Sequence, residues 1–273
     1  MAAPASPKPL EEIADPATFK ALVHVPPGRL ETPAPLLLYL HGAGESGRNV
    51  RELISEGATG TPPVELERGT AASILARKFV MVAPQTDHGW DASEVGRFVD
   101  WLLSGKAHNL PTLDRCACVC YYRLWPSPRL LHTDRMPSLT SRRRRRCYVT
   151  GHSMGGGGAV HAGTTHKFAA VVPVAGTASV RPEALNGVAV WAFHGLNDVV
   201  VPSHVSEHLV GGLRRAGVSE ANAKLTLYEH APTPKGWPDY DGHGSPIPAY
   251  ATTELYRWLL EKQLPEETRN TDL

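Results

Sequence analysis

The stretch CYVTGHSMGGGGAVHAG, residues 147 to 163, carries the strongest structural signal in the chain. Its first part is a β-type run, and the glycine-rich part after Ser153 opens a helix. A strand, a sharp turn at a serine and a helix form the context that the GxSxG elbow requires. Gly151 and Gly155 supply the room that such a strained turn needs. We therefore expect the hydroxyl of Ser153 to project from the carboxyl edge of a sheet as a nucleophile.

Short apolar runs alternate with stretches of helical period on both sides of this elbow, which predicts a mostly parallel sheet with helices on both faces, an α/β fold. The helical stretches are 93 to 104, His204–Arg215, and a closing helix from about 248 to 262. The expected strands are 19 to 25, 35 to 41, 78 to 84, 147 to 152, 169 to 176, 188 to 195 and 223 to 230.

The length of 273 residues predicts one domain spanning residues 1 to 273. Residues 105 to 146 break its pattern and are interpreted as a disordered or irregular insertion before the elbow strand. Residues 114 to 146 hold nine Arg, two Asp and no Lys, a charge of +7, whereas the whole chain has a formal charge of +1. One segment therefore supplies all the basic excess.

The inserted segment has three interpretations. Cys116, Cys118 and Cys120 suggest a metal or redox site, but they lack the CxxC pairs of zinc sites. Arg142 to Arg146 suggest nucleic-acid binding or a localisation signal, and a solvated charge run is the preferred alternative. Translated non-coding sequence would also explain the segment.

Composition and charge exclude several classes of protein. The apolar fraction of 42% is ordinary, and the chain has no run of eighteen apolar residues, which a membrane span would need. A net charge of +1 favours neither nucleic acid nor an acidic membrane as a partner. The start of the chain lacks the pattern of a secretory signal, and the cysteines form no framework across the domain. We therefore expect a cytoplasmic protein.

An acyl-transfer site needs backbone amides that stabilise the oxyanion, one after the nucleophile and one from an earlier strand end. Met154 follows Ser153, and HGAGE, residues 41 to 45, follows the run PLLLYL. Ala43 in this segment and Met154 are the predicted oxyanion-hole residues. Alternatively, HGAG is only a flexible turn after a strand.

An acid and then a base should follow the nucleophile along the chain. Asp198, in HGLNDVVVP, follows the apolar run VAVWAF. His204 and His208 are four residues apart on a helix, and a metal pair there would lack a third ligand. His230 ends a strand-like run, whereas His243 lies in the loop DGHGS before the closing helix. The residues alone favour His243 over His230 without excluding the latter, because a loop suits a base that must meet two partners.

Several motifs together resemble one branch of the α/β-hydrolase superfamily, the dienelactone-hydrolase-like and polyhydroxyalkanoate-depolymerase-like esterases, including proteins labelled predicted peptidases. They are LLLYLHGAGESGRN, VAPQT with a later tryptophan, YVTGHSMGG, HGLNDVVVP and GHGSPIPAYATTELYRWLL. The resemblance implies an α/β-hydrolase fold, assigns the catalytic base to His243 and matches Ala43 to an oxyanion amide. Dienelactone hydrolases use a cysteine nucleophile where this chain has Ser153, so their specific activity is not implied.

These observations predict a serine esterase that acts on a small-molecule ester through Ser153, His243 and Asp198, without a cofactor or metal. Trp90, Trp237 and Tyr240 are candidate substrate contacts, with a role as core aromatics as the alternative. A peptidase or thioesterase of the same fold, and a hydrolase-fold protein that binds without turnover, are the rival functions.

Overall fold

A computed structural model describes residues 9–28, 30, 33–107, 110–113 and 146–264. These residues form an eight-stranded sheet in the order β1-β2-β4-β3-β5-β6-β7-β8. The pairs β1–β2 and β2–β4 are antiparallel, and the remaining pairs are parallel. The strands are β1 (Glu11–Ala14), β2 (Lys20–His24), β3 (Leu36–Leu40), β4 (Val80–Gln85), β5 (Cys147–His152), β6 (Ala170–Val174), β7 (Ala189–Gly195) and β8 (Ala223–Tyr228).

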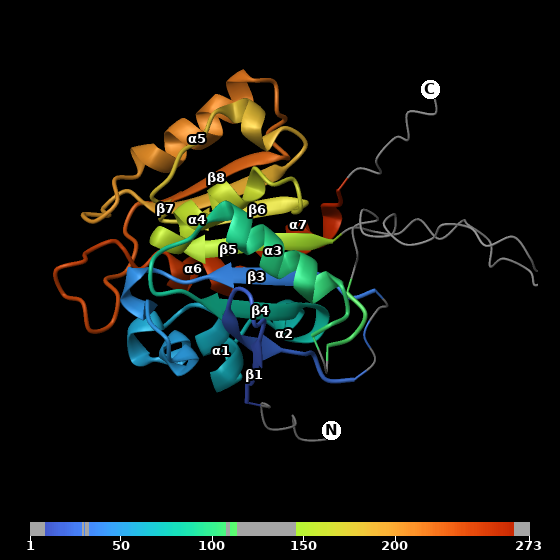
Figure 1. The fold of residues 1–273 in the computed structure, drawn as a ribbon. Coiled ribbons are helices and arrows are strands. Elements are labelled where there is room, and N and C mark those ends of the chain that lie inside the picture. Colours follow the sequence, from blue (N-terminus) through green and yellow to red (C-terminus); the bar gives the residue numbers. More distant parts are fainter. Residues whose placement is uncertain (1–8, 29, 31–32, 108–109, 114–145, 265–273) are drawn as a thin grey trace, which may run out of the picture.

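Helices cover both faces of this sheet (Figure 1). One face packs against α3 (Ala92–Leu103), α4 (Met154–Gly163) and α5 (His204–Arg215). The other packs against α1 (Pro62–Arg68), α2 (Ser73–Lys78), α6 (Pro246–Ala251) and α7 (Thr253–Glu261). Short 3₁₀ helices lie at Ala43–Glu45, Val50–Ile54, Glu56–Ala58 and Pro182–Leu185. No helix among the described residues is long and apolar enough to cross a membrane.

The central strand β3 shows why the sequence requires two covered faces. All five residues of its LLLYL sequence are buried. Successive side chains of a strand point to opposite faces, so Leu36, Leu38 and Leu40 join the core under α3, α4 and α5, whereas Leu37 and Tyr39 join the other core. A strand that is apolar on both sides is stable only between two helical layers.

The predicted fold class is confirmed, and each predicted strand is present within a few residues of its expected ends. The helix predicted over His204–Arg215 has the predicted bounds. The expectation of one closing helix from 248 to 262 is wrong, because Thr252 adopts ψ 108° and separates α6 from α7. The first strand, β1, was not predicted because its sequence EEIA is no apolar run.

Most of the segment interpreted as an insertion lies outside the described residues. Those residues, 114 to 145, include Cys116, Cys118, Cys120 and four of the five consecutive arginines. On the two sides of the gap, Leu113 forms a bridge with Ala34, and Arg146 donates a hydrogen bond to the carbonyl of Pro33. The division into one domain with an insertion stays a prediction.

Candidate active site

Ser153 occupies the sharp turn between β5 and α4. Its backbone has φ 54° and ψ −118°, and non-glycine residues rarely adopt a positive φ. The N–H of Ser153 donates to the carbonyl of Val174 at 2.9 Å, which fixes the turn to β6. A Cβ atom on Gly155 would overlap the carbonyl of Leu40, so only glycine permits α4 to start so close to β3. The surrounding backbone therefore holds the serine at the edge of the sheet.

Three side chains that are far apart in the sequence form a hydrogen-bonded series at this edge. The Oγ of Ser153 lies 2.9 Å from Nε2 of His243, and Nδ1 of His243 lies 2.8 Å from Oδ2 of Asp198. An ionised carboxylate only accepts hydrogen bonds, so Nδ1 carries the proton of a neutral His243. Nε2 is then free to accept the hydroxyl proton of Ser153, which is the arrangement of an activated nucleophile.

Three groups besides His243 contact the acid of this series, Asp198. Oδ1 of Asp198 accepts the N–H groups of Val200 and Val201, each at 2.9 Å, and Nε2 of His194 lies 3.4 Å from Oδ2. Burial alone would raise the pKa of Asp198, but hydrogen bonds from His194, His243 and Val201 reverse this and hold that pKa well below its ordinary value. Asp198 is therefore an anion at neutral pH.

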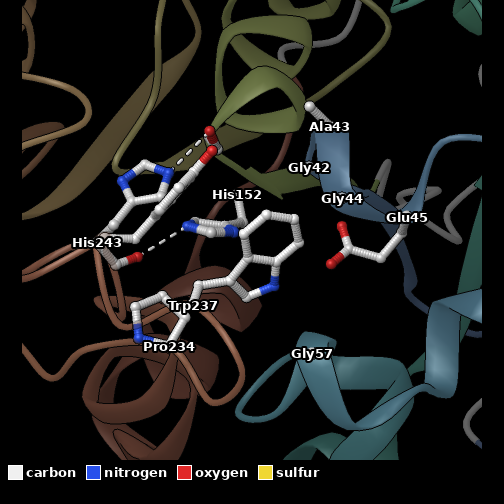
Figure 2. A pocket seen from close by; sticks show the side chains of 11 residues that line it. Gly42, Ala43, Gly44, Glu45, Gly57, His152, Pro234, Trp237 and His243 are labelled. Atoms are coloured by element: carbon white, nitrogen blue, oxygen red, sulfur yellow. Dashed lines mark hydrogen bonds between the residues drawn. The ribbon is translucent and has the colours of Figure 1, made fainter.

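The loop that carries His243 is fixed by hydrogen bonds to its backbone. The N–H of His243 donates to the carbonyl of Tyr240 at 3.1 Å, and the N–H of Gly244 donates to that of Pro232 at 2.7 Å. Figure 2 shows a third bond, from Nε2 of His152 to the carbonyl of His243 at 3.0 Å. Burial and the neighbouring His243 lower the pKa of His152 to about 3, so it stays a neutral donor.

The two residues predicted for an oxyanion hole both begin helices. Met154 is the first residue of α4, and Ala43 is the first residue of the 3₁₀ helix Ala43–Glu45. The N–H of a first helical residue has no partner within its own helix. Ala43 lines the same cavity as Ser153, and Met154 follows Ser153 directly. The backbone N–H groups of Ala43 and Met154 thus belong to residues near Ser153.

A cavity of about 200 Å³ opens in front of Ser153. Two of the three aromatic residues predicted as substrate contacts, Trp237 and Tyr240, line it. Sequence analysis did not select Glu45, Gly57, His152 or Pro234, although Glu45 and His152 lie inside the two motifs that located the site. The complete lining is Gly42, Ala43, Gly44, Glu45, Gly57, His152, Ser153, Pro234, Trp237, Tyr240 and His243.

The third aromatic residue, Trp90, does not line this cavity. Its Nε1 donates to the carbonyl of His41 at 3.0 Å, and its ring packs edge-on against His41 and Phe19. His41 accepts the N–H of Thr86 and is buried, and burial lowers its pKa to about 4. Trp90 therefore supports the strand end that precedes Ala43 instead of contacting the space before Ser153.

Among the described residues, no group of three or more His, Cys, Asp or Glu side chains is placed to hold a metal ion. His204 and His208 lie side by side on α5 with ring centres 5.5 Å apart, and both are exposed. The cysteines at 116, 118 and 120 lie outside the described residues.

The sheet order, the elbow at Ser153 and the meeting of the three side chains at one edge of the sheet belong to one class of architecture. The chain has the α/β-hydrolase fold. Structures of esterases, serine hydrolases, a dienelactone hydrolase and an acylaminoacyl peptidase share it.

Three solved structures illustrate the similarity. A thermostable esterase superposes with a TM-score of 0.63 at 24% identity, over 93% of this chain and 62% of that one. The fluorophosphonate-binding serine hydrolase F of Staphylococcus aureus, with substrate bound, gives 0.55 at 14% identity, over 93% and 99%. Esterase 2 of Thermogutta terrifontis, phosphoramylated by tabun, gives 0.55 at 13% identity, over 97% and 100%. The present chain thus spans less than two thirds of the thermostable esterase.

No family model matches the chain, and no curated protein matches it by sequence. At these identities the solved structures define the fold, and the chemistry must be argued from the site itself.

Proposed function

We propose that the protein is a serine hydrolase that cleaves small carboxylic esters through an acyl-enzyme intermediate. The observation that carries this proposal is the series of hydrogen bonds from Ser153 through His243 to Asp198 at the mouth of a cavity. The positive φ of Ser153 supports it, because backbone strain of this kind persists where the surrounding structure enforces it and clusters at reactive sites.

The proposed reaction has two stages. Ser153 attacks the ester carbonyl while Nε2 of His243 takes the hydroxyl proton, and the amides of Ala43 and Met154 stabilise the oxyanion. The carbon–oxygen bond to the alcohol then breaks, and His243 returns the proton to the departing alcohol. Water next attacks the acyl-serine with His243 as base, which releases the acid and restores Ser153. Asp198 stabilises the imidazolium in both stages.

Replacement of Ser153 by Ala tests this proposal. We expect the variant to lose several orders of magnitude of kcat/KM on p-nitrophenyl butyrate and to lose labelling by a fluorophosphonate probe. A Ser93→Ala variant, which changes an exposed serine on α3, should keep both properties. An active Ser153→Ala enzyme would refute the mechanism.

The two rival functions give different outcomes in the same experiment. A binding protein without turnover would not react with the probe, because only an activated serine reacts. A peptidase or thioesterase would react with the probe and hydrolyse its own substrates faster than matched esters. A panel of matched esters, thioesters and amides therefore distinguishes these activities.

A further inference from the structure

The cavity in front of Ser153 contains a carboxyl group that the proposed reaction does not use. Glu45 lines the cavity, and among the described residues its Oε2 is buried without a hydrogen-bond partner. The backbone around it is fixed, because Nε2 of Gln85 donates to the carbonyl of Glu45 at 2.9 Å. Burial raises the pKa of this carboxyl above its ordinary value, while the nearby backbone N–H groups of Gly42 and Glu45 act in the opposite direction and favour the charged form. A carboxylate that lines a cavity and has an oxygen without a hydrogen-bond partner is a suitable acceptor for a donor group of a ligand.

Aromatic rings form the opposite side of the cavity. Figure 2 shows the carboxyl group of Glu45 directed across the space toward the indole of Trp237. The ring centres of Trp237 and Tyr240 are 5.0 Å apart, and these side chains stay 42% and 37% exposed. A cation between a carboxylate and the face of an indole is attracted by both groups. A cation held at Glu45 would thus lie beside these rings.

No Lys or Arg belongs to the lining of this cavity. Lys235 follows Pro234 of the lining, but its Nζ lies 2.8 Å from Oε2 of Glu56, a carboxylate outside the lining. The negative charge of Glu45 is therefore not matched by a basic side chain of the cavity wall.

We propose that this cavity selects esters that carry a primary ammonium group, with Glu45 as its hydrogen-bond acceptor and Trp237 as the ring beside it. This inference rests on the proposed esterase function. A primary ammonium supplies both missing features, a hydrogen-bond donor and a positive charge for the carboxylate. A hydroxyl group would supply the donor and leave the charge unmatched, and a methyl group would supply neither.

Matched esters test the selection. The p-nitrophenyl esters of glycine, β-alanine, γ-aminobutyric acid and ε-aminocaproic acid vary the distance from the carbonyl to the ammonium group. Each is compared with the ester in which a methyl group replaces the ammonium and with the corresponding hydroxy ester. Butyrate esters of the analogous amino alcohols, followed by pH-stat titration, place the ammonium on the leaving side.

The measured quantity is the ratio of kcat/KM for an ammonium ester to that for its methyl counterpart. We expect a ratio of about ten or more for at least one chain length, the scale of one hydrogen bond to a charged group. The Glu45→Gln variant should lose most of this ratio, whereas Glu56→Gln, which changes the neighbouring carboxylate outside the lining, should keep it. Thermal unfolding of Glu45→Gln shows whether the variant folds, and Glu45→Asp provides a second variant that retains the charge.

Failure of this inference differs from failure of the proposed function. An enzyme that reacts with a fluorophosphonate and hydrolyses the methyl esters, but shows no ammonium preference on either side of the ester, overturns the ammonium selection alone. Preference for the hydroxy esters, or an ammonium preference that survives in Glu45→Gln, overturns it as well. Absence of both probe labelling and ester turnover instead overturns the esterase.

Discussion

Replacing Asp198 with Asn changes one atom of the site and reverses the direction of two hydrogen bonds. Oδ1 of Asp198 accepts the N–H groups of Val200 and Val201, so the amide oxygen of the variant must stay at this position. The new NH₂ group then faces Nδ1 of His243, which has to become the acceptor. Nε2 of His243 consequently carries the ring proton and cannot accept the proton of Ser153.

The expected loss of activity follows from this change of the His243 tautomer. In the proposed mechanism this change removes the base while the fold is kept. An Asp-to-Asn change of this type lowers kcat by about 10⁴-fold, or roughly 5 kcal/mol of transition-state stabilisation. The assay is kcat/KM on p-nitrophenyl butyrate, together with the rate of fluorophosphonate labelling. ¹⁵N NMR of the His243 ring checks the tautomer directly.

The matched control is Asp100→Asn on α3. Asp100 pairs with Lys167 at 2.7 Å on the surface, so its change should leave kcat/KM within about twofold, as expected for an exposed pair of small energetic value. If Asp198→Asn hydrolyses the ester within tenfold of the unaltered enzyme, the role assigned to Asp198 is wrong.

Three further predictions concern the support of the site. Gly155→Ala forces a Cβ into the carbonyls of Leu40 and His41 at the end of β3 and should lower the free energy of unfolding by more than about 4 kcal/mol. The control Gly211→Ala, inside α5, should raise the free energy of unfolding by about 0.5 kcal/mol, and urea titration measures both. Burial lowers the pKa of His41 from 6.5 to about 4, so between these pH values the unfolded chain binds a proton that the folded chain excludes. The free energy of unfolding should therefore fall by about 3 kcal/mol as the pH falls from 6.5 to about 4. Urea titrations at several pH values should show that the free energy of unfolding of His41→Gln falls less steeply as the pH is lowered. An unchanged dependence on pH would contradict the role given to His41. His152→Leu removes the donor to the carbonyl of His243 and should lower kcat on p-nitrophenyl butyrate about tenfold with little change in KM; an unaltered kcat in a folded variant would show that this bond does not position the base.

The sequence predicted the fold well because the decisive signals are local. The elbow needs small residues at fixed positions around Ser153, and the buried strands need apolar residues on both faces. The strand β1 has neither signal. Its residues EEIA alternate between half-buried and exposed, and backbone pairing with β2 makes it a strand. Such an edge strand is set by its neighbour and not by its composition.

The division of the predicted closing helix into α6 and α7 shows a second limit of prediction from sequence. Leu255, Trp258 and Leu259 have a helical spacing, and that spacing does not indicate where the helix begins. Thr252 ends α6 with ψ 108° and precedes the first residue of α7, while its Oγ1 donates to the carbonyl of Pro248. Side-chain hydrogen bonds of this kind compete with helical ones, and periodicity does not reveal them.

The residues of the candidate site also differ in whether a local sequence signal predicts them. The proposed nucleophile and the proposed acid follow strands, and each strand end is visible in the sequence, so Ser153 and Asp198 could be proposed from neighbouring residues alone. His243 follows no strand. Its position depends on hydrogen bonds to the carbonyls of Tyr240 and Pro232 within its own loop and on a hydrogen bond from the ring of His152 across the sheet edge. Residues alone therefore left His230 as an alternative, and the family resemblance was needed to select His243.

The same reasoning explains why part of the cavity wall was missed. Glu45, Gly57 and Pro234 belong to three separate segments, and none has a local signal for facing the others. Their proximity results from strand order, which places β3 beside β5 and so brings the loop after β3 next to the elbow. A motif thus predicts the reacting atoms, because the chemistry restricts the residues that surround them. Selectivity depends on side chains that the chemistry does not restrict, and only the assembled sheet edge brings those together.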